Sequence, residues 1–336
     1  MMTRRPVFAA VLLALALAAC GRAGAPQGGE TPGEIHFAVL STDRAPTSVA
    51  AWQAIRADMA RRTGLKVKLQ VYADPAALTE ALRRKTVDAG LASNRSGLDA
   101  VRRAGAEVFA RTDAPVSADE HAAVLITGVA RNLTLERALG CRRTLTLGMG
   151  EASSAAGALA PMTYLFAPRD IDPQTCFKRV GVGAGSASDL AAVAQGTLDL
   201  ALVDSDALAT DSARAAVVTE LWRSPPLPQN PLIRRKSLDP VIKEKLRQFF
   251  LTYGRGASPE TIKARAVLAR VGVGGFKPAD DTHLLPIREM EATSAWYGAK
   301  RGGDAAKIAA AQAALDAITA QRVTLEARTR APAAAQ

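Results

Sequence analysis

The segment GMGEASSAAG at residues 148–157 places two serines and several small residues where an apolar run gives way to a helix-forming one. A helix start leaves backbone N–H groups without intrahelical acceptors and sets the positive end of the helix dipole beside them. Such a turn can simply cap the helix through a serine hydroxyl, or it can hold an anion. The residues alone fit both interpretations, so the surrounding elements must decide.

No catalytic or metal-binding motif accompanies this turn. The three histidines, at positions 36, 121 and 283, stand at no metal-ligand spacing from another His, Cys or Asp. Neither a G-x-S-x-G elbow nor a Walker motif occurs, and GVGAGS at 181–186 departs from a dinucleotide-binding fingerprint at Ser186. We therefore predict a binding protein rather than an enzyme, with no cofactor and no metal ion.

Composition narrows the class of ligand. The 336 residues, 48% of them hydrophobic, suffice for two domains with their own cores. The net charge of +11 is spread among acidic residues without a basic block, which argues against nucleic acid and suits the steering of small anions. Aromatic residues make up only 4% of the chain, so the flat platforms of sugar-binding sites are in short supply.

The first twenty residues have the pattern of an export signal. Two arginines precede an apolar run that is too short to span a membrane, and the run ends in LAAC at 17–20. That ending matches the lipobox of bacterial lipoproteins, whose cysteine is lipidated; an ordinary signal peptide with an incidental cysteine is the weaker alternative. Residues 21–33 are rich in Gly and Pro and read as a flexible tether. We expect an exported protein, anchored to the membrane by a lipid on Cys20 and facing the periplasm.

Two further cysteines, Cys141 and Cys176, remain after Cys20. In an oxidising compartment they can pair as a disulfide, and the arithmetic of two leftover cysteines fits that arrangement. Two separate buried thiols fit the sequence equally well. Both alternatives stay open at this point.

Short apolar, β-branched runs alternate with amphipathic helical stretches from residue 35 onward. This order predicts parallel sheets covered by helices, in two α/β halves separated by a cleft. Ligands of such sheets bind at the carboxyl ends of strands, where helices begin, and 148–157 is such an end. The expected strands are 35–41, 66–72, 87–93, 106–111, 122–128, 144–150, 178–185, 198–204 and 220–225, and the expected helices are 50–64, 75–86, 96–105 and several after Asp239.

The C-terminal segment, residues 302–336, is predicted to be a long helix followed by a frayed tail. Its apolar residues Ile308, Leu315, Ile318 and Leu325 recur at helical spacing and form a stripe. We expect this stripe to pack back on the fold, with a contact between two chains as the less favoured interpretation.

Taken in order, several blocks of the chain resemble the periplasmic phosphonate-binding proteins of ABC importers. The likeness runs from about residue 35 to 301. The order and spacing of the blocks are more specific to the family than any one block is. The resemblance implies a type II periplasmic-binding-protein fold, in which two α/β lobes, joined by crossing strands near 121–126 and 220–224, close on a ligand. Lobe 1 would comprise 34–121 and 221–301, and lobe 2 would comprise 122–220. The blocks are VLSTDRAP, VDAGLASN, VFAR, GMGEASSAAG, FAPRDIDPQTCFKR, LWRSPPLPQNPLI, VLARVGVGGFKPADD and LLPIRE.

The same resemblance implies that the turn at 148–157 is an anion site. In the family this turn typically reads Ser-Thr-Ser-Gly and holds the phosphonate oxygens; here Ser154, Ala155, Ala156 and Gly157 take its place. One hydroxyl is kept, and the two alanines offer only their N–H groups.

Other positions of the family's pocket have changed. His121 stands where a tyrosine is usual, Ser186 where a histidine is expected, and Pro75 where a second tyrosine is lost. Of two carboxylates that hold a ligand's ammonium group, one matches Asp206 and the other is Asn230.

We therefore predict the substrate-binding component of an ABC importer for phosphonate, phosphite or phosphate. Its partners would be the permease and ATPase subunits, and it would be a monomer or a weak dimer through the C-terminal helix. A diverged binding or sensor protein for another small anion is the first alternative. An exported enzyme on the same scaffold is the second, since a fold does not fix a function.

Overall fold

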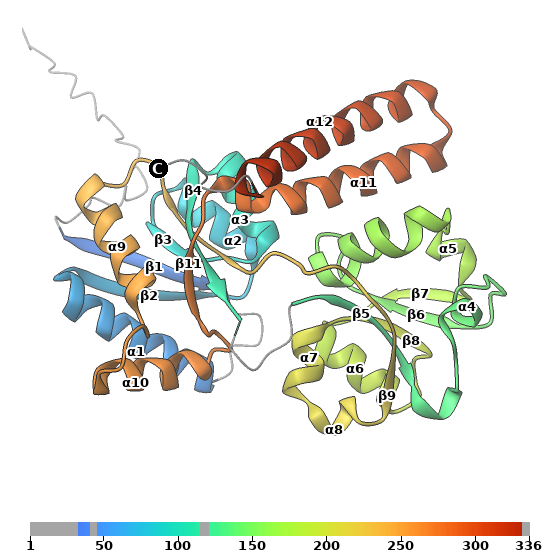
Figure 1. Cartoon of the computed structure of the whole chain (residues 1–336), viewed down its shortest axis with the longest axis horizontal. Helices are drawn as coiled ribbons and strands as arrows, with labels where there is room; N and C mark the ends of the chain where they lie inside the picture. The colour runs from blue at the N-terminus through green and yellow to red at the C-terminus, as the bar shows by residue number, and fades with distance from the viewer. Residues whose placement is uncertain (1–32, 41–45, 115–120, 331–336) are drawn as a thin grey trace, which may run out of the picture.

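The computed structural model describes residues 33–40, 46–114 and 121–330, which form two lobes that lie side by side (Figure 1). Each lobe holds one β-sheet with helices packed on it, so the predicted pair of α/β halves is confirmed. The predicted signal, Cys20 and most of the tether lie outside the described residues. Within the described part of the chain, every helix is too short or too polar to cross a membrane.

The first lobe has a six-stranded sheet in the order β11-β4-β10-β3-β1-β2. Its centre is aromatic: Phe250 stacks on Phe37 at 5.3 Å between ring centroids and meets Phe276 edge-on at 4.9 Å. The strands are β1 (Glu34–Leu40), β2 (Lys66–Tyr72), β3 (Ala89–Leu91), β4 (Ala106–Asp113), β10 (Pro231–Arg235) and β11 (Gly275–Pro278), and the helices are α1 (Pro46–Thr63), α2 (Pro75–Arg83), α3 (Asn94–Arg103), α9 (Pro240–Thr252) and α10 (Pro259–Ala269).

A buried ion pair joins the start of β3 to the end of β10. Arg235 Nη2 lies 2.5 Å from Asp88 Oδ1, and the two side chains are 3% and 9% exposed. The other carboxylate oxygen of Asp88 accepts a hydrogen bond from the backbone N–H of His36 at 2.8 Å. The carboxylate is therefore fully engaged inside the protein.

The second lobe has a five-stranded sheet in the order β7-β6-β8-β5-β9. Its strands are β5 (Ala123–Gly128), β6 (Thr146–Met149), β7 (Arg179–Val182), β8 (Leu200–Asp204) and β9 (Val218–Arg223). Its helices and helical turns are η1 (Val129–Arg131), α4 (Leu135–Ala138), η2 (Ala155–Leu159), η3 (Met162–Phe166), η4 (Ala167–Arg169), α5 (Pro173–Cys176), α6 (Ser186–Ala194), α7 (Ser205–Thr210) and α8 (Ser212–Ala215).

Both sheets are mixed, so the prediction of parallel sheets is wrong in part. Within the lobes β1 runs parallel to β2 and β3, and β6 runs parallel to β7 and β8. The strands that follow a passage between the lobes, β5 and β10, run antiparallel to β8 and to β3. They start at the edge where the neighbouring strands end, because the chain enters each lobe from the side of the other lobe.

The chain passes from β4 to β5 between Asp113 and Ala123, and returns from β9 to β10 between Arg223 and Pro231. The crossings expected near 121–126 and 220–224 are therefore misplaced by a few residues. Most of those positions are paired strand residues of β5 and β9 in the second sheet, and the predicted lobe boundary at 221 falls inside β9.

A disulfide joins Cys141 and Cys176, whose sulfur atoms are 2.06 Å apart. Of the two alternatives that the sequence left open, the structure has the paired one. The bond links the loop after α4 to the end of α5, near the amino ends of β6 and β7. It closes a loop with a sequence separation of 35 residues that contains β6 and the turn after it.

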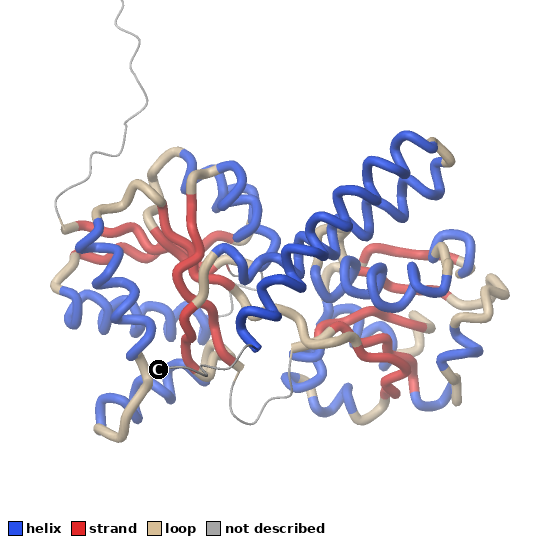
Figure 2. The backbone as a smooth tube through the Cα atoms, turned by 45° about the horizontal axis from the view of Figure 1, so that its top comes forward, coloured by secondary structure: helices blue, strands red, loops and turns tan. Residues whose placement is uncertain are grey.

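Two long antiparallel helices end the described chain, with η5 (Asp281–Leu284) leading into them: α11 (Leu285–Gly302) and α12 (Ala305–Arg330) (Figure 2). The start of α11 is joined to the first lobe, where Glu291 pairs with Arg102 of α3 at 2.8 Å. The end of α11 is joined to the second lobe, where Lys300 pairs with Asp170 at 2.8 Å. Helix α12 lies along α11, and Thr319 donates a hydrogen bond to Glu289 at 2.9 Å.

Candidate functional site

Most of the predicted site residues lie at one edge of the second sheet, next to the ends of its strands. The carboxyl ends of β6, β7 and β8 lie together because these strands are parallel neighbours, and the amino end of β5 lies beside them because β5 is antiparallel to β8. The chain enters from the first lobe before β5 and returns to it after β9, so this edge faces the first lobe (Figure 1). Ser154, Ser186, His121 and Asp206 all follow or precede these strand ends.

The turn after β6 folds tightly against its own strand. Gly150 N–H donates to the carbonyl of Gly157 at 3.0 Å. A Cβ built on Gly157 would lie 2.6 Å from Gly150 Cα, which no side chain tolerates, so a close backbone approach requires glycine here. This contact sets where η2 begins.

Ser154 is the N-cap of η2, and its Oγ accepts a hydrogen bond from Gly157 N–H at 3.0 Å. The backbone carbonyl of Ser154 accepts from both Ala158 N–H and Leu159 N–H, at 3.2 and 2.9 Å, so the first turn is wide. The hydroxyl acts as an acceptor in this cap, and its own O–H hydrogen is left to donate to another group. The capping role and an anion-binding role are therefore compatible.

The N–H groups of Ala155 and Ala156 are the remaining donors of this turn. Among the described residues, neither donates a hydrogen bond to an acceptor of the protein. The side chain of Ala156 is buried in an apolar cluster that holds residues of both lobes and of α11, and the side chain of Ala155 packs against the same cluster. Two backbone donors and one hydroxyl at the positive end of a helical turn form an arrangement that suits an oxyanion.

Ser186 begins α6 and connects it to β8. Its Oγ accepts a hydrogen bond from the backbone N–H of Asp204 at 2.9 Å. The resemblance placed this serine at a changed position of the family's pocket, and the bond shows a structural role, since it holds the end of a strand against the start of a helix.

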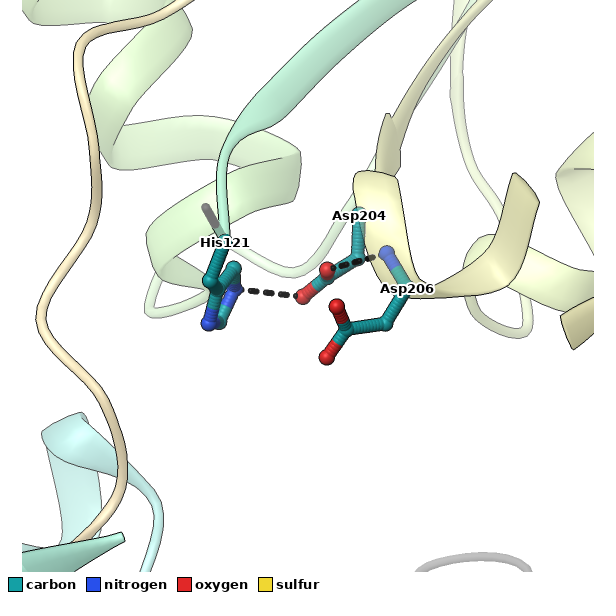
Figure 3. Close-up of side chains that lie close together, drawn as sticks. All are labelled: His121, Asp204 and Asp206. Atoms are coloured by element: carbon teal, nitrogen blue, oxygen red, sulfur yellow. Dashed lines mark hydrogen bonds and ion pairs between the residues drawn. The ribbon is translucent and has the colours of Figure 1, made fainter. Parts of the chain in front are cut away.

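His121, Asp204 and Asp206 form a cluster that the spacing along the chain did not reveal (Figure 3). One potential ligand atom from each lies within 4.8 Å of the other two, a proximity in space that the expectation of no metal ion did not consider. That expectation tested positions close in sequence, whereas these groups come from the entry to β5, the end of β8 and the first turn of α7.

Asp204 is the member that sequence reasoning missed. Its Oδ1 accepts from Asp206 N–H at 3.0 Å as the cap of α7, and its Oδ2 lies 2.8 Å from His121 Nε2. The sequence did contain a signal for this pair of carboxylates: Asp204 and Asp206 are separated by one serine at the end of a buried strand.

Charge within the cluster shifts two pKa values. Burial lowers the pKa of His121, but the Asp204 carboxylate, helped by Asp206, outweighs it, and the pKa is raised from its ordinary value. Partial desolvation, together with the neighbouring Asp204 carboxylate, raises the pKa of Asp206 against the opposing effect of His121, although the Asp206 side chain is exposed.

Asn230 lies outside this cluster, on the return passage to the first lobe. Its carbonyl accepts from Thr112 N–H at 2.9 Å, and its side chain is exposed. The same passage runs beside His121, since Leu227 N–H donates to the His121 carbonyl at 2.7 Å. Pro75 is the first residue of α2 in the first lobe, behind the capping Asp74.

A cavity of about 530 Å³ lies between the return passage, β11, and the helices η5, α11 and α12. Of the predicted site residues, His121 lines it and the turn at Ser154 does not. Two of its basic groups share one carboxylate, because Asp113 lies 2.8 Å from Lys277 and 3.7 Å from Arg111. The cavity therefore adjoins the cluster without enclosing the turn at residues 154–157.

Three comparisons relate the chain to known proteins. A family described as the periplasmic substrate-binding protein of a phosphonate ABC transporter matches residues 37–284. The phosphonates-binding periplasmic protein of Escherichia coli K12 is 31% identical over 273 residues, which cover 79% of this chain and 78% of that protein.

Solved structures show the same likeness. A binding protein component of an ABC phosphonate transporter from Pseudomonas aeruginosa is 30% identical, with a TM-score of 0.71 over 88% of this chain and 97% of that one. The methylphosphonate complex of PhnD1 from Prochlorococcus marinus has a TM-score of 0.64 at 15% identity, covering 77% of this chain and 97% of that one. At that identity the second likeness shows the fold alone.

Proposed function

Because the chain belongs to the family of periplasmic substrate-binding proteins of phosphonate ABC transporters, we propose that it captures a phosphorus oxyanion for import. The observation that carries this proposal is the pair of N–H donors at Ala155 and Ala156, which join the Ser154 hydroxyl on the edge that faces the first lobe. The named relatives carry phosphonates, and the same donors suit phosphite or phosphate. The captured anion would pass to permease and ATPase subunits.

The two lobes supply the mechanism, which is capture by closure. Both passages between the lobes start or end at the edge that carries the anion turn, so a rotation about them brings the first lobe over the ligand. The ligand stabilises the closed form because only that form contacts it from both sides. No bond is made or broken, as befits a family of transport proteins.

A panel of anions tests the proposal by thermal unfolding. A ligand that binds only the folded protein raises its melting temperature. We expect methylphosphonate, ethylphosphonate, phosphite or phosphate to raise it, and sulfate to leave it unchanged. A shift with sulfate alone would assign the site to another class of anion, and turnover of a phosphonate by the purified protein would favour an enzyme.

Ligand choice is predicted to favour tails without a positive charge. The resemblance implies that neutral Asn230 replaces a second carboxylate of the family's site, and Asp204 already faces His121. A desolvated ammonium group that lacks its counter-charge costs several kcal/mol, and each 1.4 kcal/mol is about tenfold in affinity. We expect calorimetry to show ethylphosphonate binding at least about tenfold more tightly than aminoethylphosphonate.

The variant Asn230→Asp should shift this preference back towards the amine ligand. Phosphite, which has no tail, is the control and should bind both proteins with similar affinity. Equal affinity of the unchanged protein for both phosphonates would contradict the prediction.

We also propose that the protein is tethered to a membrane through a lipid on Cys20. The LAAC sequence at 17–20 supports this, together with the basic and apolar residues before it. Cys20→Ser is expected to release the protein from membranes or to leave an uncleaved precursor. Labelled fatty acid should enter the unchanged protein and not the variant, and absence of label from both would refute the anchor.

A further inference from the structure

The first lobe carries a row of exposed basic residues along the edge of its sheet where β1, β2, β3 and β4 begin. These four strands share the edge because they are parallel to one another, and the antiparallel β10 ends there. Backbone bonds fix the alignment: Lys66 N–H donates to the Gly33 carbonyl and Lys236 N–H to the Gly105 carbonyl, both at 2.8 Å. The basic row comprises four exposed side chains: Lys66 at the start of β2, Lys85 before β3, Arg103 before β4 and Lys236 after β10.

The positive charge of the basic row is largely unpaired. Among the described residues, Lys236 lies 3.8 Å from the Asp281 carboxylate, and no ion pair joins the other three members of the row to an acid. The acids at this edge are engaged by other groups, since Glu34 lies 2.6 Å from Lys68 and Asp88 pairs with the buried arginine of β10. The edge therefore has an excess of positive charge that is open to a partner.

The described chain begins at the same edge. Gly33 directly precedes β1, which lies between β2 and β3 in the sheet. Figure 1 shows the start of β1 on the side of the first lobe that is turned away from the second lobe. Cys20, the proposed lipid anchor, is 13 residues before Gly33 in the sequence, and 13 residues span at most about 45 Å. An anchored chain would therefore keep the basic row near the membrane surface.

We propose that the basic row lies against the anionic headgroups of a phospholipid membrane. Its position at the membrane rests on the proposed lipid anchor, whereas the attraction itself rests only on charge. Neighbouring strands are about 4.8 Å apart, so the row from β4 to β2 extends over about 19 Å, which is too long for one small anion and matches a surface that carries many. The opposite edge of the sheet faces the second lobe, so this contact leaves ligand capture unobstructed.

Binding of the exported chain without its lipid to vesicles tests the basic row. This chain begins after Cys20 and keeps every residue that the structure describes. We expect it to sediment with vesicles that contain phosphatidylglycerol and to stay in solution with vesicles of pure phosphatidylcholine. Added salt should release it, because the Debye length shortens from about 8 Å at physiological ionic strength to about 3 Å at 1 M.

A variant that neutralises three members of the row measures their contribution: Lys66→Gln, Lys85→Asn and Arg103→Gln combined. Asparagine is used at position 85 because the backbone there is left-handed, with φ 61°. Each basic residue near an anionic membrane contributes about fivefold to binding, so we expect binding at least about 20-fold weaker. Circular dichroism checks that the variants fold.

The matched control makes the same change in net charge at exposed positions outside the row, and it should weaken binding far less. It combines Arg179→Gln at the start of β7, Arg247→Gln in α9 and Arg270→Gln after α10. Equal weakening by the two variants would mean that net charge alone acts, and it would overturn the row. Absence of binding to the anionic vesicles, or equal binding to both kinds of vesicle, would overturn it too.

The anchor and the row can fail separately. Incorporation of labelled fatty acid tests the anchor, and the vesicle experiment uses a chain that has no lipid. Binding to anionic vesicles without incorporation of label would support the row and refute the anchor. Incorporation of label without binding of the lipid-free chain would support the anchor and refute the row.

Discussion

Replacing Ala155 with proline is expected to abolish most oxyanion binding while leaving the protein folded. Ala155 is the first residue of η2, a position where proline is well tolerated because its missing N–H has no intrahelical acceptor. Ser154 already has the extended backbone that a following proline requires, with φ −70° and ψ 125°. The substitution therefore removes a donor without disturbing the turn.

The expected loss follows from the kind of hydrogen bond involved. A bond to a charged acceptor contributes about 1.5–3 kcal/mol, or roughly 10- to 150-fold in affinity, and the proline ring also crowds the anion. Calorimetry with methylphosphonate measures the loss. An unchanged dissociation constant would place the anion elsewhere.

Two further variants separate binding from stability. Ser154→Ala removes the cap and the hydroxyl donor together, so it should cost about 1 kcal/mol of unfolding free energy and weaken binding about tenfold. Ala305→Pro makes the same substitution at the first residue of α12, behind the capping Asp304, and should leave anion binding unchanged.

Breaking the ion pair between Asp88 and Arg235 is expected to cause the largest loss of stability. Both residues are buried, and Arg235→Leu leaves the Asp88 carboxylate inside the protein without its cation. Removal of one partner from a buried pair costs about 3–5 kcal/mol, because the remaining charge is desolvated and uncompensated. Urea unfolding of the two proteins measures the difference.

A surface pair provides the comparison. Arg83 lies 2.6 Å from Glu80 on the exposed face of α2, and Arg83→Ala should change the free energy of unfolding little. A loss of that same small size for Arg235→Leu would mean that the buried carboxylate finds water or another donor.

Local residue patterns predicted most strands, and they failed where tertiary contacts decide. The runs at 66–72 and 198–204 alternate or are continuously apolar, and they became β2 and β8. β10 was missed because its sequence, PLIRR, ends in two arginines, which count against burial until Asp88 is known to lie beside Arg235. For β5 the strand was predicted but its direction was missed, since the direction depends on where the chain crosses between the lobes.

The candidate site also has features that local sequence predicts and features that depend on tertiary contacts. The capping serine and its neighbouring N–H donors were predictable, because an N-terminal turn is encoded by consecutive residues such as 154–157. The link between Ser186 and Asp204, and the approach of His121 to Asp204, join segments that are distant in sequence. The pairing of β5 with β8 brings His121 to Asp204, and the pairing of β6 with both β7 and β8 brings the start of α6 to the end of β8.

The disulfide between Cys141 and Cys176 makes the anion turn tolerant of a cut backbone. The turn lies inside the loop that this bond closes, and its residues 151–153 are exposed, where a protease finds the chain most easily. A single cleavage there yields two pieces that stay covalently joined, and the strands on either side of the cut remain paired in one sheet. Nicked protein would therefore run as one band on a non-reducing gel and as two after reduction.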